Sequence, residues 1–172
     1  MNGKIYTLIL CLIIVPQRMS AAVNIIDPEW RYPNKSDIKW DWKDYFEINP
    51  EPFHIVGDFN GDGLQDNAWI MIGVKDSNAW RLSVHLTQES GDDKIFILDE
   101  SFQGIPAQAY GLTKLSPGHY LSVCNKGHGD TSRCMEDEID IPYDGINFFR
   151  YESAGRIFYY KNDKFNFIWE SD

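Results

Sequence analysis

The stretch that decides the fold is His54–Val74, which reads HIVGDFNGDGLQDNAWIMIGV. It places a glycine-rich acidic segment, Gly57–Asp66, between two apolar segments. The second apolar segment, Asn67–Val74, is almost continuous, as expected of a strand in the middle of a sheet. The stretch therefore predicts two strands joined by a tight polar loop, in which glycines adopt backbone angles that other residues avoid.

Oxygen-bearing side chains occupy positions 1, 3, 5 and 9 of this loop, as Asp58, Asn60, Asp62 and Asp66. Calcium takes about six to eight oxygen ligands and tolerates irregular geometry, so a loop that turns alternate side chains inward suits it. Position 7 is Leu64, which would contribute its backbone carbonyl. Carboxylates this close together repel one another unless a cation neutralises them. We therefore predict a Ca²⁺ site, the alternative being an Asx-rich turn without a metal.

The loop differs from an EF-hand, because position 12 is Trp69 where an EF-hand carries a bidentate glutamate. The order of strand, DxNxDGxxD loop and strand resembles instead the FG-GAP/VCBS type of calcium loop over residues 54–73. That resemblance says nothing about the rest of the chain. It implies the same metal ligands, which are Asp58, Asn60, Asp62, the backbone of Leu64, and Asp66.

The C-terminal segments Glu152–Tyr160 (ESAGRIFYY) and Phe165–Asp172 (FNFIWESD) carry a second resemblance. With the loop and a cysteine pair, they are similar to a type of small exported proteobacterial protein. This resemblance implies a related fold and implies no particular activity.

Alternation of apolar and polar residues predicts strands through most of the chain. The clearest is Trp80–Gln88, and Arg156–Lys161 with Lys164–Trp169 predicts a hairpin closed by the two residues Asn162 and Asp163. The predicted strands cover residues 54–57, 67–74, 80–88, 94–98, 120–124, 146–151, 156–161 and 164–169.

A short helix is predicted before these strands, capped by Ser36 and running to about Phe46. Its Ile38, Trp42 and Tyr45 are spaced to share one face. The expected fold class is mainly β, with antiparallel sheets of about eight strands in a sandwich or an open barrel-like form, and one short N-terminal helix.

The first residues have the layout of a secretory signal peptide. Lys4 precedes the apolar run Ile5–Val15, and Ser20–Ala22 supplies small residues for a signal peptidase. A membrane anchor is the alternative, but it needs about 20 apolar residues, and polar residues interrupt the run. We expect residues 1–22 to be removed. A single calcium-loop β domain over 23–172 then remains, without a membrane span, in the periplasm or secreted.

Removal of that segment leaves 16 − 2 = 14 lysines and arginines against 26 acidic residues, a net charge of −12. Nucleic-acid binding is not expected, because phosphate contacts need clustered Lys and Arg. Such acidity suits cations or a basic protein partner, or serves solubility alone.

Two cysteines follow the predicted cleavage site, Cys124 and Cys134. An even pair in an exported protein predicts a disulfide, and neither CxxC nor HxxxH spacing is present to favour zinc. The loop that they close contains Lys126, His128 and Asp130, which are candidate recognition residues. A stapled hairpin end without a ligand is the alternative.

No G-x-S-x-G, S-x-x-K or H-E-x-x-H motif is present, so no catalytic residue is predicted. The first hypothesis is an exported calcium-binding protein that acts as a binding or inhibitor module for a protein partner, such as an immunity protein against a secreted toxin. The alternatives are an envelope hydrolase with a structural calcium, and a structural or adhesive module.

Overall fold

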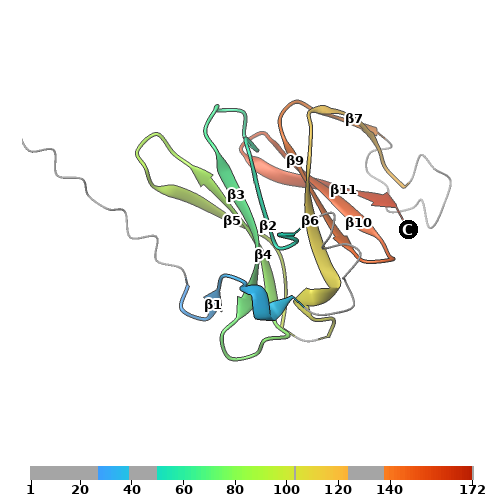
Figure 1. Cartoon of the computed structure of the whole chain (residues 1–172). Helices are drawn as coiled ribbons and strands as arrows, with labels where there is room; N and C mark the ends of the chain where they lie inside the picture. Colours follow the sequence, from blue (N-terminus) through green and yellow to red (C-terminus); the bar gives the residue numbers. More distant parts are fainter. Residues whose placement is uncertain (1–26, 39–49, 103, 124–137, 172) are drawn as a thin grey trace, which may run out of the picture.

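A computed structural model describes residues 27–38, 50–102, 104–123 and 138–171 (Figure 1). Several predictions concern residues outside these ranges: the signal peptide, the disulfide Cys124–Cys134, and the recognition residues Lys126, His128 and Asp130. They stay predictions. Within the described ranges, no helix combines the length and the apolar character needed to cross a membrane.

The first half of the described chain forms an antiparallel sheet, sheet A, in the order β1-β3-β4-β5, with β2 also paired to β3. The register sets Ala68 opposite Val84 and Ile70 opposite Leu82, so these apolar residues share one face. The strands are β1 (Trp30–Arg31), β2 (His54–Gly57), β3 (Asp66–Gly73), β4 (Trp80–Thr87) and β5 (Asp93–Ser101).

The second half forms two more antiparallel sheets. Sheet B has the order β11-β10-β9-β6, and its predicted hairpin is confirmed, with positive φ at Asn162 and Asp163 as a two-residue turn requires. Sheet C pairs β7 with β8. The strands are β6 (Tyr110–Leu115), β7 (Gly118–Leu121), β8 (Glu138–Ile141), β9 (Gly145–Arg150), β10 (Gly155–Lys161) and β11 (Lys164–Ser171).

The main hydrophobic core lies between sheets A and B, which Figure 1 shows as two facing layers. Ile70 and Leu82 of sheet A and Leu112 and Phe148 of sheet B belong to it, and each is at most 2% exposed. A smaller core fills the opposite face of sheet B, where Ile157 packs with residues of sheet C. Sheet B is therefore covered on both faces, and the fold is a sandwich with a small third layer.

The mainly β, antiparallel prediction is confirmed, and several of its details differ from the structure. The described residues contain eleven strands instead of about eight, because β1, β6 and β8 are additional. They form three separate sheets and not a closed barrel. The strand predicted at 120–124 is also displaced, since β7 ends at Leu121.

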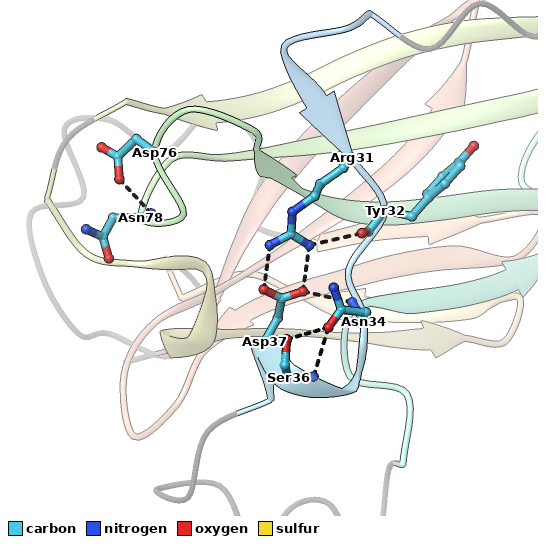
Figure 2. A network of polar contacts seen from close by, with 7 residues as sticks. All are labelled: Arg31, Tyr32, Asn34, Ser36, Asp37, Asp76 and Asn78. Atoms are coloured by element: carbon cyan, nitrogen blue, oxygen red, sulfur yellow. Dashed lines mark hydrogen bonds and ion pairs between the residues drawn. The ribbon is translucent and has the colours of Figure 1, made fainter.

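Ser36 does not cap a helix. The cap is Asn34, whose side-chain oxygen accepts hydrogen bonds from the backbone N–H (2.9 Å) and the hydroxyl (2.6 Å) of Ser36 (Figure 2). The capped element is one 3₁₀ turn, Lys35–Asp37, and residues 39–49 lie outside the described ranges. Asp37 also holds Arg31 of β1 through two contacts of 2.7 Å, which fixes the turn against sheet A.

Candidate metal-binding loop

The predicted metal loop connects β2 to β3. The two strands end their pairing at Gly57 opposite Asp66, so the residues between them project beyond the end of the sheet. Gly61 and Gly63 have φ of 78° and 85°, a region that side chains with a Cβ rarely adopt. The chain therefore doubles back tightly enough to bring alternate side chains together.

Asp58 organises the first half of the loop. Its Oδ1 accepts hydrogen bonds from the backbone N–H of Gly61 (2.7 Å) and Asp62 (3.1 Å), and its Oδ2 accepts one from Gly63 (3.0 Å). An ionised carboxylate has about four acceptor positions on its two oxygens. Asp58 can therefore hold the turn and still offer a position to a cation.

Asn60 and Asp62 share the same turn. The Asn60 side chain donates to Asp62 Oδ2 at 2.8 Å, and its oxygen accepts from the Asp62 N–H at 3.1 Å. Asp62 Oδ1 accepts from the N–H of Leu64 at 2.8 Å. These contacts, together with those of Asp58, place three of the predicted ligand side chains in one small polar cluster.

Asp66 differs from the other three because it is completely buried. Its Oδ2 accepts from the N–H of Phe59 at 2.9 Å and its Oδ1 from the N–H of Thr87 at 2.9 Å. Burial raises the pKa of Asp66, the two amide bonds lower it, and the charges of Asp62 and Asp58 raise it further. An ionised Asp66 is therefore costly at neutral pH without a nearby cation.

Asp144, between β8 and β9, also anchors the loop, although no motif in the sequence pointed to it. Asp144 Oδ2 accepts from the N–H of Asp58 and from Lys114 Nζ, each at 3.1 Å, and the Asp144 N–H donates to the Asp58 carbonyl at 3.1 Å. The neighbouring ring of Tyr143 rests on Gly61, where an added Cβ would lie 2.1 Å from Tyr143 Cε1. The loop is thus attached to sheet B as well as to sheet A.

The donor chemistry fits calcium, since carboxylate, amide and carbonyl oxygens are the ligands that this ion prefers. In the described part of the chain, no group of three or more His, Cys, Asp or Glu side chains converges on one metal position. Calcium at this loop therefore stays a prediction. Comparison of the chain with protein-family models, curated proteins and solved structures returned no match.

A pocket of about 280 Å³ lies at the edge of sheet A beside β2, away from the loop. Trp69 forms part of its wall, with the ring of His54 stacked on the indole at a centroid distance of 3.5 Å. The remaining wall combines three prolines and two other apolar residues with the polar residues Asn34, Lys35 and Glu51. Its other lining residues are Pro33, Asn34, Lys35, Ile38, Pro50, Glu51, Pro52 and Phe53.

Ser83, His85 and Asp93 form a second polar cluster, on the face of sheet A that points away from sheet B. His85 Nε2 lies 2.9 Å from Ser83 Oγ, and its Nδ1 lies 3.7 Å from an oxygen of Asp93. This order of groups resembles a nucleophile, base and acid. Ser83 is 1% exposed, however, so a substrate does not reach its hydroxyl, and we assign the cluster a structural role.

The protein should lose stability as the pH falls below the ordinary histidine pKa of 6.5, partly through His85. Burial lowers the pKa of His85, and this effect outweighs the attraction of Asp93. As the pH falls below 6.5, His85 therefore takes up a proton more readily in the unfolded chain than in the folded one, which favours unfolding. For one group the slope is at most about 1.4 kcal/mol per pH unit. Urea unfolding at pH 7.5 and 5.5 measures it, and His85→Gln should reduce it.

His119 provides the opposite control. Its hydrogen bond to Asp140 and the nearby charge of Glu138 raise its pKa, so its contribution to stability grows as the pH falls and is lost as the pH rises. His119→Gln should therefore steepen the loss on acidification. An unchanged pH slope in His85→Gln would contradict the role assigned to His85.

Proposed function

We propose that this protein is an exported, calcium-stabilised β module that binds or inhibits a protein partner. The observation that carries the calcium part is the β2–β3 loop, in which Asp58, Asn60 and Asp62 share one turn and a buried Asp66 closes it. A cation offsets both the repulsion within this cluster and the cost of burying Asp66. The residues that would hold it are Asp58, Asn60, Asp62, the carbonyl of Leu64, and Asp66.

The binding part of the proposal rests on charge. The chain has 26 acidic residues against 16 lysines and arginines, which suits a basic protein partner better than an anionic one. An immunity protein that blocks a secreted toxin is one form of such a module. A calcium site attached to two sheets at once would keep the module rigid outside the cell, where calcium is abundant.

Calcium binding should weaken in acid. The carboxylates must be ionised to hold the ion, and the pKa of Asp66 is raised by burial, so the affinity should fall below about pH 5. Titration calorimetry at pH 7.5 and pH 4.5 measures this directly, with Mg²⁺ as a control for binding by charge alone. An affinity that does not change between the two pH values would contradict carboxylate ligation.

Partner binding needs a separate test. The immobilised protein, loaded with calcium, should retain a specific protein from a periplasmic extract of its own source, and a chelator should release that protein. Asp58→Ala should retain less of it if calcium holds the module in its binding form. Repeated calcium-loaded trials that retain no specific partner would contradict the binding function and leave the calcium site untouched.

A further inference from the structure

The metal loop begins where three segments of the chain meet. The segment that leads into β2 lies beside β6 of sheet B, since the N–H of Leu112 donates to the carbonyl of Pro52 at 2.8 Å. At Gly57, the last residue of β2, an added Cβ would lie 2.9 Å from Asp144 Oδ2 and 3.0 Å from Lys114 Cδ. The missing side chain therefore lets β6 and the β8–β9 connection approach the backbone at the start of the loop.

Asp144 of the β8–β9 connection binds Asp58 through both of its backbone groups. The Asp58 N–H donates to Asp144 Oδ2 at 3.1 Å, and the Asp58 carbonyl accepts from the Asp144 N–H at 3.1 Å. These two groups belong to the peptide units on either side of the Asp58 Cα atom. The direction in which the Asp58 side chain leaves the backbone is therefore fixed by a residue outside the loop.

That direction matters because the Asp58 carboxylate organises the loop. It accepts hydrogen bonds from the backbone N–H groups of Gly61, Asp62 and Gly63, and it is the first of the predicted calcium ligands. In metal sites, the residues that hydrogen-bond to a ligand orient it and adjust the affinity for the metal. Asp144 stands in this relation to Asp58.

Lys114 of β6 balances the charge of Asp144. Lys114 Nζ lies 3.1 Å from Asp144 Oδ2, the oxygen that also accepts from the Asp58 N–H. The Asp144 side chain is only 19% exposed, so this ion pair is partly shielded from water. Asp144 therefore adds little repulsion to the three carboxylates of the loop, and its contacts suit a supporting role better than direct ligation.

We propose that Asp144 is a positioning residue of the calcium site, an inference that rests on the site proposed above. By holding Asp58 in the orientation that binds the ion, Asp144 links occupancy of the loop to the β8–β9 connection of sheet B. Such coupling is reciprocal. If the contact with Asp144 favours calcium binding, then bound calcium strengthens the contact with Asp144.

Titration calorimetry with calcium tests this role, at a temperature at which all variants are folded. Asp144→Ala should weaken calcium binding about 10–100-fold, as the loss of such a supporting partner does in other metal sites. Asp144→Asn loses the same negative charge but keeps an oxygen that accepts from the Asp58 N–H, so it should retain most of the affinity. Equal losses in the two variants would mean that the charge of Asp144 matters and its hydrogen bond does not.

Asp99→Ala is the matched control. The Asp99 side chain accepts a backbone N–H, from Glu100 at 2.9 Å, and pairs with a basic side chain of sheet B, Arg156. It therefore has the same two kinds of partner as Asp144, but it lies in β5 and contacts no residue of the loop in these bonds. Its loss weakens the link between the sheets elsewhere and should leave the calcium affinity unchanged.

Hydrogen exchange of the wild-type protein gives a second readout that needs no variant. The Asp144 amide, which donates to Asp58, should exchange more slowly with calcium than with chelator. The Ser153 amide, which donates to Arg150 in the β9–β10 turn, should not change.

The outcomes separate this inference from the calcium site itself. A wild-type protein that binds no calcium would overturn both. Calcium binding that Asp144→Ala leaves unchanged, or that Asp144→Asn weakens as much as Asp144→Ala does, would overturn the positioning role alone. An Asp144 amide whose exchange does not respond to bound calcium would do the same.

Discussion

Calcium should raise the melting temperature of this protein by about 5–10 °C at a concentration near 100 times the dissociation constant, and Asp58→Ala should abolish the rise. A ligand at that excess stabilises the folded state by about 2.7 kcal/mol. For a domain of this size, 1 kcal/mol shifts the melting temperature by about 2–4 °C. Differential scanning calorimetry with calcium and with chelator measures the shift.

The measured quantity must be the increment caused by calcium and not the melting temperature itself. Asp58 accepts three backbone hydrogen bonds, so Asp58→Ala also lowers the stability of the calcium-free protein. Asp58→Asn keeps an acceptor oxygen and removes the charge, and it should lose most of the increment while folding more stably than Asp58→Ala.

Asp76→Ala is the matched control for loss of an aspartate from a turn. The side chain of Asp76 accepts one backbone hydrogen bond, from the N–H of Asn78 at 2.9 Å, in an exposed turn beyond the opposite end of β3 from the loop (Figure 2). This variant should keep the full calcium increment. Identical melting curves of the wild-type protein with calcium and with chelator would disprove the calcium site.

The strands that the sequence predicted are those with strong local patterns. Trp80–Thr87 alternates through its whole length, and the β10–β11 hairpin has both alternation and two turn residues with positive φ. Two of the missed strands are too short for a local pattern to identify them. β1 has two residues and exists only through its pairing with Gly73 and Ile72, and β8 is four residues long with two acids. Tertiary pairing forms such strands, so no window of sequence shows them.

The loop shows the same division between local and distant contacts. Asp58, Asn60 and Asp62 lie within five residues of one another, and the contacts of their side chains follow from spacing and glycine positions. The attachment of Asp58 to Asp144 joins residues 86 apart in the chain. The sequence predicted Asp66 as a ligand, but it did not predict the burial of Asp66 or its hydrogen bond to the N–H of Thr87 in β4. Both depend on the packing of the sheet.

Gly61→Ala should destabilise the protein far more than Gly63→Ala, although both glycines have positive φ. The backbone strain common to the two substitutions costs about 1–2 kcal/mol. At Gly63 nothing lies within 4 Å of an added Cβ, so no further cost arises. At Gly61 the added Cβ meets the ring of Tyr143 at 2.1 Å, and forcing the loop and ring apart adds about 1–3 kcal/mol. Urea unfolding of both variants measures the difference.

Repeating both glycine substitutions in a Tyr143→Ala background separates the backbone strain at each glycine from the contact between the added Cβ at position 61 and the Tyr143 ring. If Tyr143 is what makes Gly61→Ala more costly, its removal should bring the two glycine substitutions to the same cost, as a double-mutant cycle shows. A difference that persists without Tyr143 would mean that the loop does not rest on this ring. If the costs do become equal, the β2–β3 loop is coupled to the β8–β9 connection. An ion bound in the loop would then stabilise sheet B as well as the hairpin that contains it.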